Sequence, residues 1–398
     1  MACGSAPPTD TPPPAAAAAS TPDGPAPPQA RTKVEPDPDF LEALGEAAFS
    51  TFGWDTDFSL HTIDYGEIFS GGVGRDGIPP IDNPMFESVA QVNEWLAPLE
   101  PVIALEVDGV AKAYPLQILT RHEIVNDEIG GVPVAVTFCP LCNSAIVFDR
   151  RLNGVVYDFG VSGNLRNSDL IMWDRQTQSW WQQLTGEGIV GALAGERLTF
   201  IPAQLVAWKT YAEAYPTSEV LSRETGFRIA YGTNPYVGYD RLDQRPFLFD
   251  GEADGRLQPM ERVAAVAIGD AGVAFPFRIL AEERVVNYRI GGRDIAVFYE
   301  PGARSALDAR VIASAREVGA TGVFDPVVDG MKLTFAFADD GGGRIVDEET
   351  GSTWSILGEA VAGPLEGTKL GRVVHSDHFW FAWAAFHPDT VVYGGATE

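Results

Sequence analysis

The chain has 398 residues, with 55 acidic and 28 basic side chains, and its formal net charge is -27. Phosphate backbones and anionic membrane surfaces repel so acidic a chain, and we therefore expect no nucleic-acid partner. No apolar run approaches the roughly 18 residues of a membrane-spanning helix, and the length favours two or three domains of ordinary size.

The N-terminal segment, residues 1–37, is rich in Pro and Ala. Such a tract buries too little apolar surface to fold, so we expect a disordered tether. Its first residues, Met1-Ala2-Cys3-Gly4-Ser5, resemble the start of a mature bacterial lipoprotein, in which the cysteine carries lipid. The signal segment that precedes such a cysteine is missing from the sequence. We expect an extracytoplasmic, cell-envelope lipoprotein that contacts the membrane only through a lipid on Cys3.

Residues 38–100 form an N-terminal helix and loop segment. Helices are expected over 41–49 and 89–96, and the Gly/Pro-rich stretch 70–84 favours a loop between them. From residue 101 the chain predicts a strand at 102–107, an Asp108-Gly109 turn and a strand at 110–114. A short helix follows over 115–124, with Pro115 in its first turn and His122 near its end. Strands at 132–138 and 145–148 then flank Cys139-Pro140-Leu141-Cys142.

An internal repeat dominates the rest of the chain. Residues 113–140 and 274–301 align without a gap, and 12 of the 28 positions are identical. Asn126 recurs there as Asn287. Further along the chain, Asp174 and Trp181 recur as Asp347 and Trp354, which indicates structural roles. The predicted fold class is therefore α+β and β-rich, with an internal duplication that gives two similar packed lobes. They span 101–221 and 262–398, joined by a connector, 222–261.

The two lobes differ at the residues that can carry chemistry. His122, Cys139 and Cys142 align with Glu283, Glu300 and Ala303, so the second lobe is degenerate and only the first carries the Cys/His site. If these three residues served the fold, both copies would need them.

The C-x-x-C pair has three ordinary meanings: a metal site, a redox couple or a structural disulfide. A thioredoxin-like pair begins a helix, whereas Asn143-Ser144-Ala145-Ile146 favours a strand. A turn between strands is typical of half a metal site. We predict a metal site of His122, Cys139 and Cys142 with an open fourth position. Thiolate ligands favour copper or zinc as the cofactor.

The catalytic residues are not determined by these patterns. Asn164, Asn167, Ser168 and Asp169 lie in a polar turn with no alignable counterpart in the second lobe, and they are candidates for lining a pocket. The catalytic candidates are Glu123, Asn167 and Asp169.

Several motifs together resemble the bacterial family known as domain of unknown function 3179. They are Asp76-Gly77-Ile78-Pro79-Pro80-Ile81-Asp82, Ala113-Tyr114-Pro115-Leu116, His122-Glu123-Ile124-Val125-Asn126-Asp127, Thr137-Phe138-Cys139-Pro140-Leu141-Cys142 and Asn167-Ser168-Asp169-Leu170. The resemblance runs from about Ser70 to Val392. It implies an exported or anchored protein and carries over His122, Cys139 and Cys142, but it implies no activity.

Three hypotheses for function follow. The first is an extracytoplasmic protein with a copper or zinc site, which as an enzyme would use the metal on a small substrate. The second is a thiol-disulfide redox protein that uses Cys139 and Cys142 on a thiol substrate. The third is a non-catalytic binding module whose C-x-x-C pair is a structural disulfide. Whether the protein is an enzyme stays open at this point.

Overall fold

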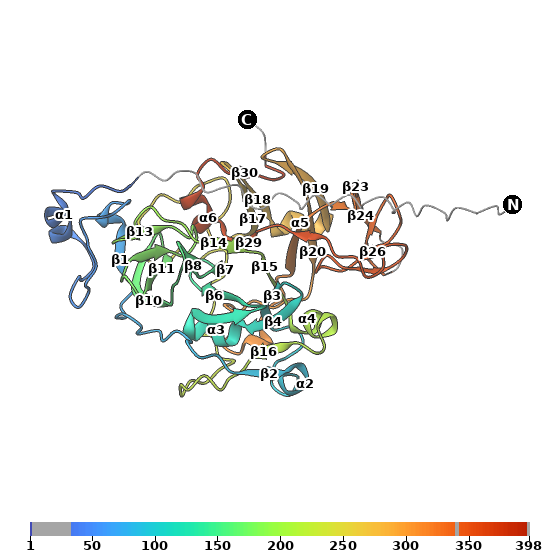
Figure 1. Cartoon of the computed structure of the whole chain (residues 1–398), viewed down its shortest axis with the longest axis horizontal. Coiled ribbons are helices and arrows are strands. Elements are labelled where there is room, and N and C mark those ends of the chain that lie inside the picture. Colours follow the sequence, from blue (N-terminus) through green and yellow to red (C-terminus); the bar gives the residue numbers. More distant parts are fainter. Residues whose placement is uncertain (2–32, 339–341, 396–398) are drawn as a thin grey trace. The chain divides into compact units, whose positions relative to one another are not determined.

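The computed structural model describes Met1, residues 33–338 and residues 342–395. From Val34 onward these residues belong to one compact unit that is rich in β-strands (Figure 1). None of the helices in these residues is both long and apolar enough to cross a membrane. Cys3 and residues 2–32 of the expected tether lie outside the described residues, so the lipidation prediction stays a prediction.

The first half of the unit begins its repeated part with a hairpin and a short helix. β3 (Pro101–Val107) pairs antiparallel with β4 (Val110–Pro115) through the expected Asp108-Gly109 turn. β4 runs directly into α3 (Leu116–His122), for which Pro115 is the N-cap residue. The sheet order is β15-β3-β4-β16-β2, with β15 (Ala203–Ala207), β16 (Glu219–Leu221) and β2 (Phe86–Ser88).

Two further sheets complete this half. One has the order β14-β7-β6-β5, with β14 (Thr199–Ile201), β7 (Ser144–Asp149), β6 (Val132–Cys139) and β5 (Ile124–Ile129). The other has the order β1-β10-β11-β12-β13, with β1 (Ile68–Ser70), β10 (Phe159–Arg166), β11 (Asp169–Asp174), β12 (Trp180–Gln182) and β13 (Gly188–Val190). The remaining elements are α1 (Phe40–Glu46), η1 (Tyr65–Glu67), α2 (Val89–Val92), β8 (Arg151–Leu152), β9 (Val155–Val156) and α4 (Trp208–Ala214).

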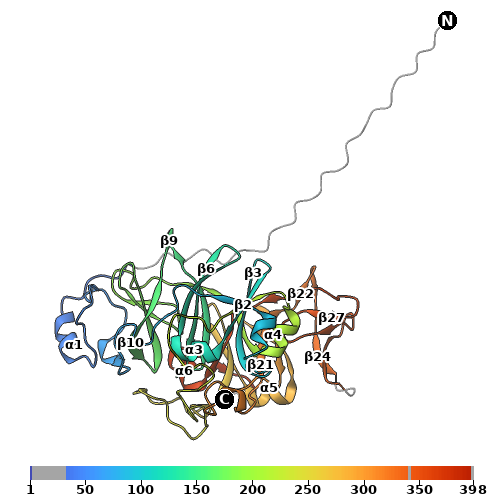
Figure 2. The same ribbon diagram turned by 90° about the horizontal axis from the view of Figure 1, so that it is seen from below.

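The second half has three sheets of similar strand order, with four strands in its first and third sheets instead of five. Its first sheet is β29 (Ser376–Phe379), β17 (Arg262–Ile268), β18 (Ala271–Pro276) and β30 (Val391–Val392). Its second sheet is β28 (Gly371–Arg372), β21 (Ala320–Asp325), β20 (Arg293–Glu300) and β19 (Val285–Ile290). Its third sheet, visible beside β22 in Figure 2, is β24 (Phe335–Ala338), β25 (Arg344–Asp347), β26 (Thr353–Trp354) and β27 (Ala360–Ala362). The other elements are α5 (Phe277–Glu283), η2 (Ile312–Ser314), β22 (Val327–Val328), β23 (Met331–Lys332) and α6 (Trp380–Phe386).

The two halves pack through equivalent strands. β15 of the first half contacts β21 of the second, and β29 of the second contacts β7 of the first. At the second of these contacts the N–H of Phe379 donates to the carbonyl oxygen of Cys142 at 2.9 Å. Phe138, Val147 and Trp380 belong to one buried apolar cluster that draws on both halves. The cysteine turn is thus fixed in part by the second half.

The aspartates predicted to be structural make the same bond in both halves. Asp174 accepts a hydrogen bond from the indole N–H of Trp181 at 2.9 Å, and Asp347 accepts one from Trp354 at the same distance. All four side chains are buried. A buried carboxylate needs such donors, which accounts for the recurrence of the pair.

The recurrent asparagines behave alike as well. Asn126 donates to the carbonyl of Phe159 at 2.8 Å and accepts from its N–H at 3.0 Å. Asn287 makes the same two bonds with Phe335 at the same distances. Each asparagine therefore ties the second sheet of its half to a backbone segment of the third, in agreement with the predicted structural role.

The elements predicted between residues 101 and 148 occur in the expected order, with one strand missed among them. The sequence analysis assigned no element between α3 and the Gly130-Gly131 turn, yet β5 occupies this segment. Its polar residues concealed the strand, because Asn126 and Asp127 are buried and satisfied by distant partners. Asp127 accepts from Lys112 at 3.0 Å and from Tyr114 at 2.7 Å. The predicted helices are also shorter than expected: α3 ends at His122 and α2 at Val92.

A bulge in β10 depends on Gly163. The β10–β11 register shifts between Val161 and Leu165, and Gly163 lies there with a φ of +83°. Its carbonyl accepts from the N–H of Gly71 at 2.8 Å, which fixes the Gly-rich loop against β10. A Cβ at residue 163 would lie 2.3 Å from the carbonyl oxygen of Val73. This site needs glycine for both its backbone conformation and its close contact.

We predict that Gly163→Ala lowers the free energy of unfolding substantially more than Gly154→Ala. Gly154 has a φ of +81°, and a Cβ there would meet nothing within 4 Å. The control therefore carries the conformational cost alone, about 1–2 kcal/mol, while Gly163→Ala adds a clash of about 1–3 kcal/mol. Urea unfolding midpoints measure both changes. Equal losses in the two variants would contradict the close packing of loop 70–84 on β10.

Candidate metal centre

The cysteines lie on a tight turn between two strands, as the sequence predicts. Cys139 is the last residue of β6 and pairs with Ser144, the first residue of β7. Cys142 lies within the turn, and Asn143 closes it with a φ of 55°, a conformation that asparagine tolerates better than most residues. No helix begins at either cysteine, so a helix dipole does not lower the pKa of these thiols in the way it does in thioredoxin-like sites.

A second hairpin brings a carboxylate to the same place. Asn167 and Ser168 connect β10 to β11 with φ values of 51° and 66°, and Arg166 pairs with Asp169 across the turn. Two consecutive positive φ angles define the type I′ turn that suits a two-residue hairpin. The Sγ atoms of Cys142 and Cys139 lie 3.5 Å and 3.9 Å from the carbonyl oxygen of Ser168.

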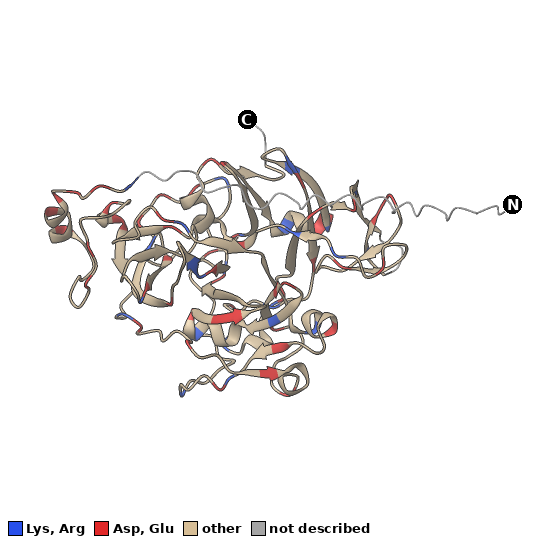
Figure 3. Ribbon diagram, viewed as in Figure 1, with Lys and Arg blue, Asp and Glu red and all other residues tan. Residues whose placement is uncertain are grey.

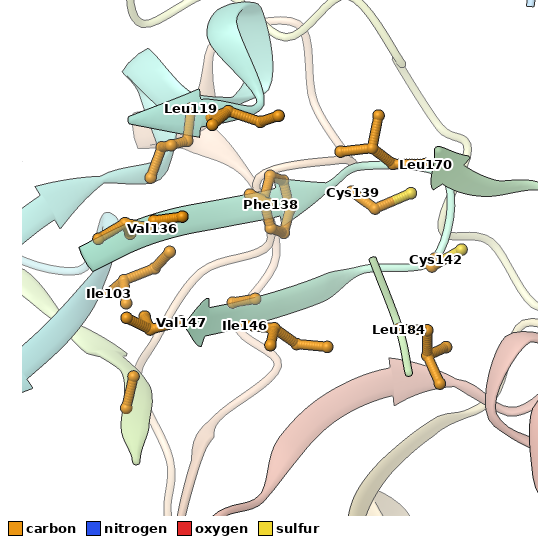
Figure 4. Packing of buried hydrophobic residues seen from close by; sticks show 14 of the residues in the cluster. Ile103, Leu119, Val136, Phe138, Cys139, Cys142, Ile146, Val147, Leu170 and Leu184 are labelled. Atoms are coloured by element: carbon orange, nitrogen blue, oxygen red, sulfur yellow. The ribbon is translucent and has the colours of Figure 1, made fainter. Parts of the chain in front are cut away.

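Cys139, Cys142 and Asp169 form a buried group that can hold a metal ion. One ligand atom of each lies within 4.8 Å of the others. Two sulfur ligands on one zinc ion are separated by at most about 4.6 Å, twice a Zn–S bond, so the group is close to coordinating dimensions. Figure 4 shows the two sulfur atoms on the same side of the turn, near Leu170 at the start of β11. The structure thus brings together two predicted ligands with a residue predicted as a catalytic candidate.

One oxygen atom of the Asp169 carboxylate accepts hydrogen bonds from the protein, and the other accepts none from nitrogen or hydroxyl donors. Its Oδ2 accepts from the amide of Gln182 at 2.6 Å and from the N–H of Leu184 at 2.9 Å. Its Oδ1 has no nitrogen or hydroxyl donor within the described part of the chain, and the same holds for the Oγ of Ser168 and the Oε1 of Gln182. Buried oxygen atoms without donors are costly. The thiols of Cys139 and Cys142 lower the pKa of this carboxylate by hydrogen bonding, so a cation at this position would replace their protons.

The electrostatics of the group keep the two thiols protonated near neutral pH unless a cation is bound, and burial also raises the pKa of the carboxyl group. Burial raises the pKa of Asp169 to about 6. Burial also raises the pKa of the Cys139 thiol, and the nearby carboxylates of Asp169 and Glu123 raise it further. Burial, together with Cys139 itself, raises the pKa of Cys142 well above its usual value. A bound metal ion removes this penalty because it stabilises the deprotonated ligands.

His122 does not belong to this group, in contrast to the sequence prediction. Among the described residues the group contains no histidine. The Nδ1 of His122 lies 2.6 Å from the carbonyl oxygen of Pro79, and its Nε2 lies 2.7 Å from the hydroxyl of Tyr231. Both ring nitrogens are therefore engaged, and the ring is fully buried. Burial lowers the pKa of His122, which keeps the imidazole neutral.

Glu123 occupies a backbone kink that belongs to the fold. It ends α3 with φ 60° and ψ -32°, and Arg284 ends α5 with φ 67° and ψ -35°. Each residue donates its N–H to a carbonyl of the preceding helix, and its own carbonyl accepts the N–H of Phe138 in β6 or of Tyr299 in β20. Since both halves share the kink, the strain is structural. Only the side chain differs, and Glu123 brings its carboxyl close to Asp169.

A cavity of about 830 Å³ opens beside the group. Leu141 and Leu170 line it and are next to Cys142 and Asp169 in sequence, and Glu123, whose carboxyl interacts with that of Asp169, lines it as well. Asn164, which the sequence analysis proposed for a pocket, also lines it. The opposite wall comes from the connector 222–261, for which the sequence predicted no functional part. Asn167 is absent from the lining and is half-buried at the hairpin tip, where its positive φ shapes the turn.

The second half keeps the scaffold without the donors. Glu300 ends β20 where Cys139 ends β6, and it accepts a hydrogen bond from Thr210 at 3.1 Å. Arg284 stands in place of Glu123. Gly342, five residues before Asp347, stands where Asp169 precedes Asp174. The loss of Asp169 from the second half is a signal that sequence comparison could have used to find the third donor.

We predict that burial of Glu123 makes metal-free protein less stable as the pH rises. Burial raises its pKa from 4.5 to about 8, against a hydrogen bond from Tyr236 that lowers it. The native state therefore holds a proton that the unfolded chain releases, and stability falls between about pH 4.5 and pH 8. Glu123→Gln should remove this decline and exceed wild type at pH 8 by at least about 1 kcal/mol.

Urea unfolding in the presence of a chelator at pH 5 and pH 8 measures this effect. Asp169 and Cys139 interact with Glu123 and titrate as well, so the difference between the two proteins reports Glu123 together with its coupling to these two groups. Glu94→Gln, at an exposed position, controls for the loss of one carboxyl group. A parallel pH dependence of wild type and Glu123→Gln would contradict the burial of an ionisable Glu123 at this site.

The comparisons with known proteins assign the chain to a family, and they assign no function. The comparison with curated proteins and the comparison with solved structures each found no match. A family model described as "Protein of unknown function (DUF3179)" matches residues 75–390, which include β2 through α6 and hence the whole candidate site. This confirms the family resemblance seen in the sequence motifs. The chain belongs to the DUF3179 family.

Proposed function

We propose that this protein is a zinc-dependent enzyme acting on a small substrate, with Cys139, Cys142 and Asp169 as the metal ligands. The observation that carries the proposal is the approach of two buried thiols and one buried carboxylate to within 4.8 Å of one another. The Oδ1 of Asp169, which accepts from no nitrogen or hydroxyl donor among the described residues, supports it. Three protein donors leave a fourth tetrahedral position for water or substrate, which is the pattern of catalytic zinc sites.

The donor set favours zinc over copper. Thiolates suit both cuprous copper and zinc, but a carboxylate oxygen is a hard ligand that zinc accepts and cuprous copper does not prefer. Bound zinc supplies a Lewis acid that polarises a carbonyl group or lowers the pKa of a water molecule. Glu123 lines the cavity and its raised pKa, about 8, suits it to exchange a proton with a bound substrate near neutral pH.

The redox alternative is less well supported. Thiol-disulfide exchange needs an accessible thiolate, and burial raises the pKa of both Cys139 and Cys142. Cys142 is fully buried and Cys139 is 2% exposed, so a thiol substrate would have to displace packed side chains. A structural disulfide would account for the burial of both sulfurs and leave the unpartnered carboxylate oxygen unexplained.

The remaining sequence expectations also enter the proposal. The acidic composition and the Pro/Ala-rich first 37 residues support an extracytoplasmic protein anchored through Cys3, with no nucleic-acid partner. We further propose that the two halves descend from one duplicated unit. The similar strand orders and the repeated Asp–Trp and Asn–backbone bonds support that origin.

We predict that protein purified without chelator and dialysed against zinc contains about one zinc per chain. Cys139→Ser and Asp169→Asn should each weaken binding at least about tenfold, because each removes a donor. Elemental analysis by plasma mass spectrometry provides the measurement. His122→Ala should keep its zinc, since the ring nitrogens bind Pro79 and Tyr231 instead.

Cys3→Ser provides the matched cysteine control and should keep its zinc as well. Metal-free wild type with a disulfide between Cys139 and Cys142 would overturn the proposal, and its ease of reduction would then separate a redox couple from a structural bridge. Loss of zinc in His122→Ala would instead establish His122 as a ligand, as the sequence predicts.

A further inference from the structure

We propose that the cavity beside the metal centre binds an amphipathic organic anion, with Arg245 holding the anionic group at the mouth and the apolar walls enclosing an aryl or alkyl body. This inference rests on the proposed function, because it names the substrate class of the same site. It stands on residues of the connector and of β10 that take no part in metal binding.

The walls of the cavity suit an apolar body. Tyr236, Tyr239 and Phe247 of the connector face Val161 and Leu165 of β10 among its lining residues. A volume of about 830 Å³ falls within the range of small-molecule sites, roughly 300–1,000 Å³. Aromatic side chains provide large apolar contact areas with few rotatable bonds. The ligand that fits therefore has an apolar middle.

The charge of the ligand follows from Arg245. Glu123 and Arg245 are the charged residues that line the cavity, and Glu123 is 7% exposed. Arg245 is exposed and makes no hydrogen bond or ion pair with any described residue. Its neighbours in the connector differ: Arg241 pairs with Asp243 at 2.6 Å and Arg256 with Asp254 at 2.7 Å.

Among the described residues the side chains of Arg228 and Arg310 also make no hydrogen bond or ion pair, but of these three arginines Arg245 is the one that lines the cavity. Acidic side chains outnumber basic ones by 55 to 28, and Figure 3 shows them spread over helices, strands and loops. In such surroundings an arginine finds a carboxylate easily, so one left unpaired at the edge of a cavity is available for an incoming anion. Its planar fork matches carboxylates and phosphates.

The inner end of the cavity offers hydrogen bonds. Asn164 is 6% exposed, lines the cavity and makes no side-chain hydrogen bond within the described residues. The bulge at Gly163 turns this residue toward the cavity, which is a common use of a bulge next to a site. A ligand that spans the cavity therefore has an anionic end at Arg245 and a polar end near Asn164 and Glu123.

Three probe molecules with the same phenylbutyl body and different end groups test whether the cavity prefers an anionic ligand. Isothermal titration calorimetry with the full chain compares 4-phenylbutyrate, 4-phenylbutanol and 4-phenylbutylamine. The carboxylate should bind about fivefold more tightly than the alcohol, and the amine should bind most weakly. Arg245→Gln should remove the advantage of the carboxylate and leave the alcohol unchanged, while Arg241→Gln, the matched control, should change neither. Equal binding of the three probes, no binding, or an unaffected Arg245→Gln would overturn the inference.

Repeating the titration on Cys139→Ser separates this inference from the proposed function. One outcome is that zinc-free Cys139→Ser still prefers the carboxylate probe and that wild type contains no zinc either. This outcome upholds the anion cavity and overturns the metal centre. Stoichiometric zinc in wild type without probe discrimination upholds the metal centre and overturns the anion cavity.

Discussion

The burial of three acidic donors side by side is the constraint on which the site depends. Cys139, Cys142 and Asp169 are at most 2% exposed, and their ligand atoms lie within 4.8 Å of one another. Ionising them without a cation is costly in a low-dielectric environment. The two thiols are therefore either protonated or bound to a metal near neutral pH, and the Asp169 carboxylate beside them favours a bound cation. The hairpins that carry them are fixed by backbone pairing, which leaves them little freedom to separate.

The second half shows what the fold requires without the site. It retains the helix-ending kink and the Asp–Trp bond, while Glu300, Ala303 and Gly342 stand in place of the three donors and Arg284 in place of Glu123. The scaffold thus accepts different side chains at these places. The kink at Glu123 is consequently no sign of catalysis by itself, and the function of the first half depends on which side chains stand there.

Local patterns in the sequence were sufficient for much of the fold and for part of the site. The strand–turn–strand setting of Cys139 and Cys142 follows from β-branched residues on either side of a short turn. The third donor could not be placed this way, because Asp169 reaches the cysteines through a separate hairpin and His122 is diverted to Pro79 and Tyr231. β5 was missed since its buried polar residues find partners far away in sequence. The connector wall of the cavity likewise depends on tertiary packing that no local pattern indicates.

X-ray absorption spectroscopy of the zinc-loaded protein tests the metal centre most directly. The account predicts two sulfur ligands at about 2.3 Å and oxygen ligands at about 2.0–2.2 Å, without the outer-shell scattering of an imidazole. The Asp169→Asn variant should change the oxygen shell and leave the sulfur shell intact, if it is loaded with excess zinc. A first shell without sulfur, or one with a clear imidazole signature, would contradict the ligand set of Cys139, Cys142 and Asp169.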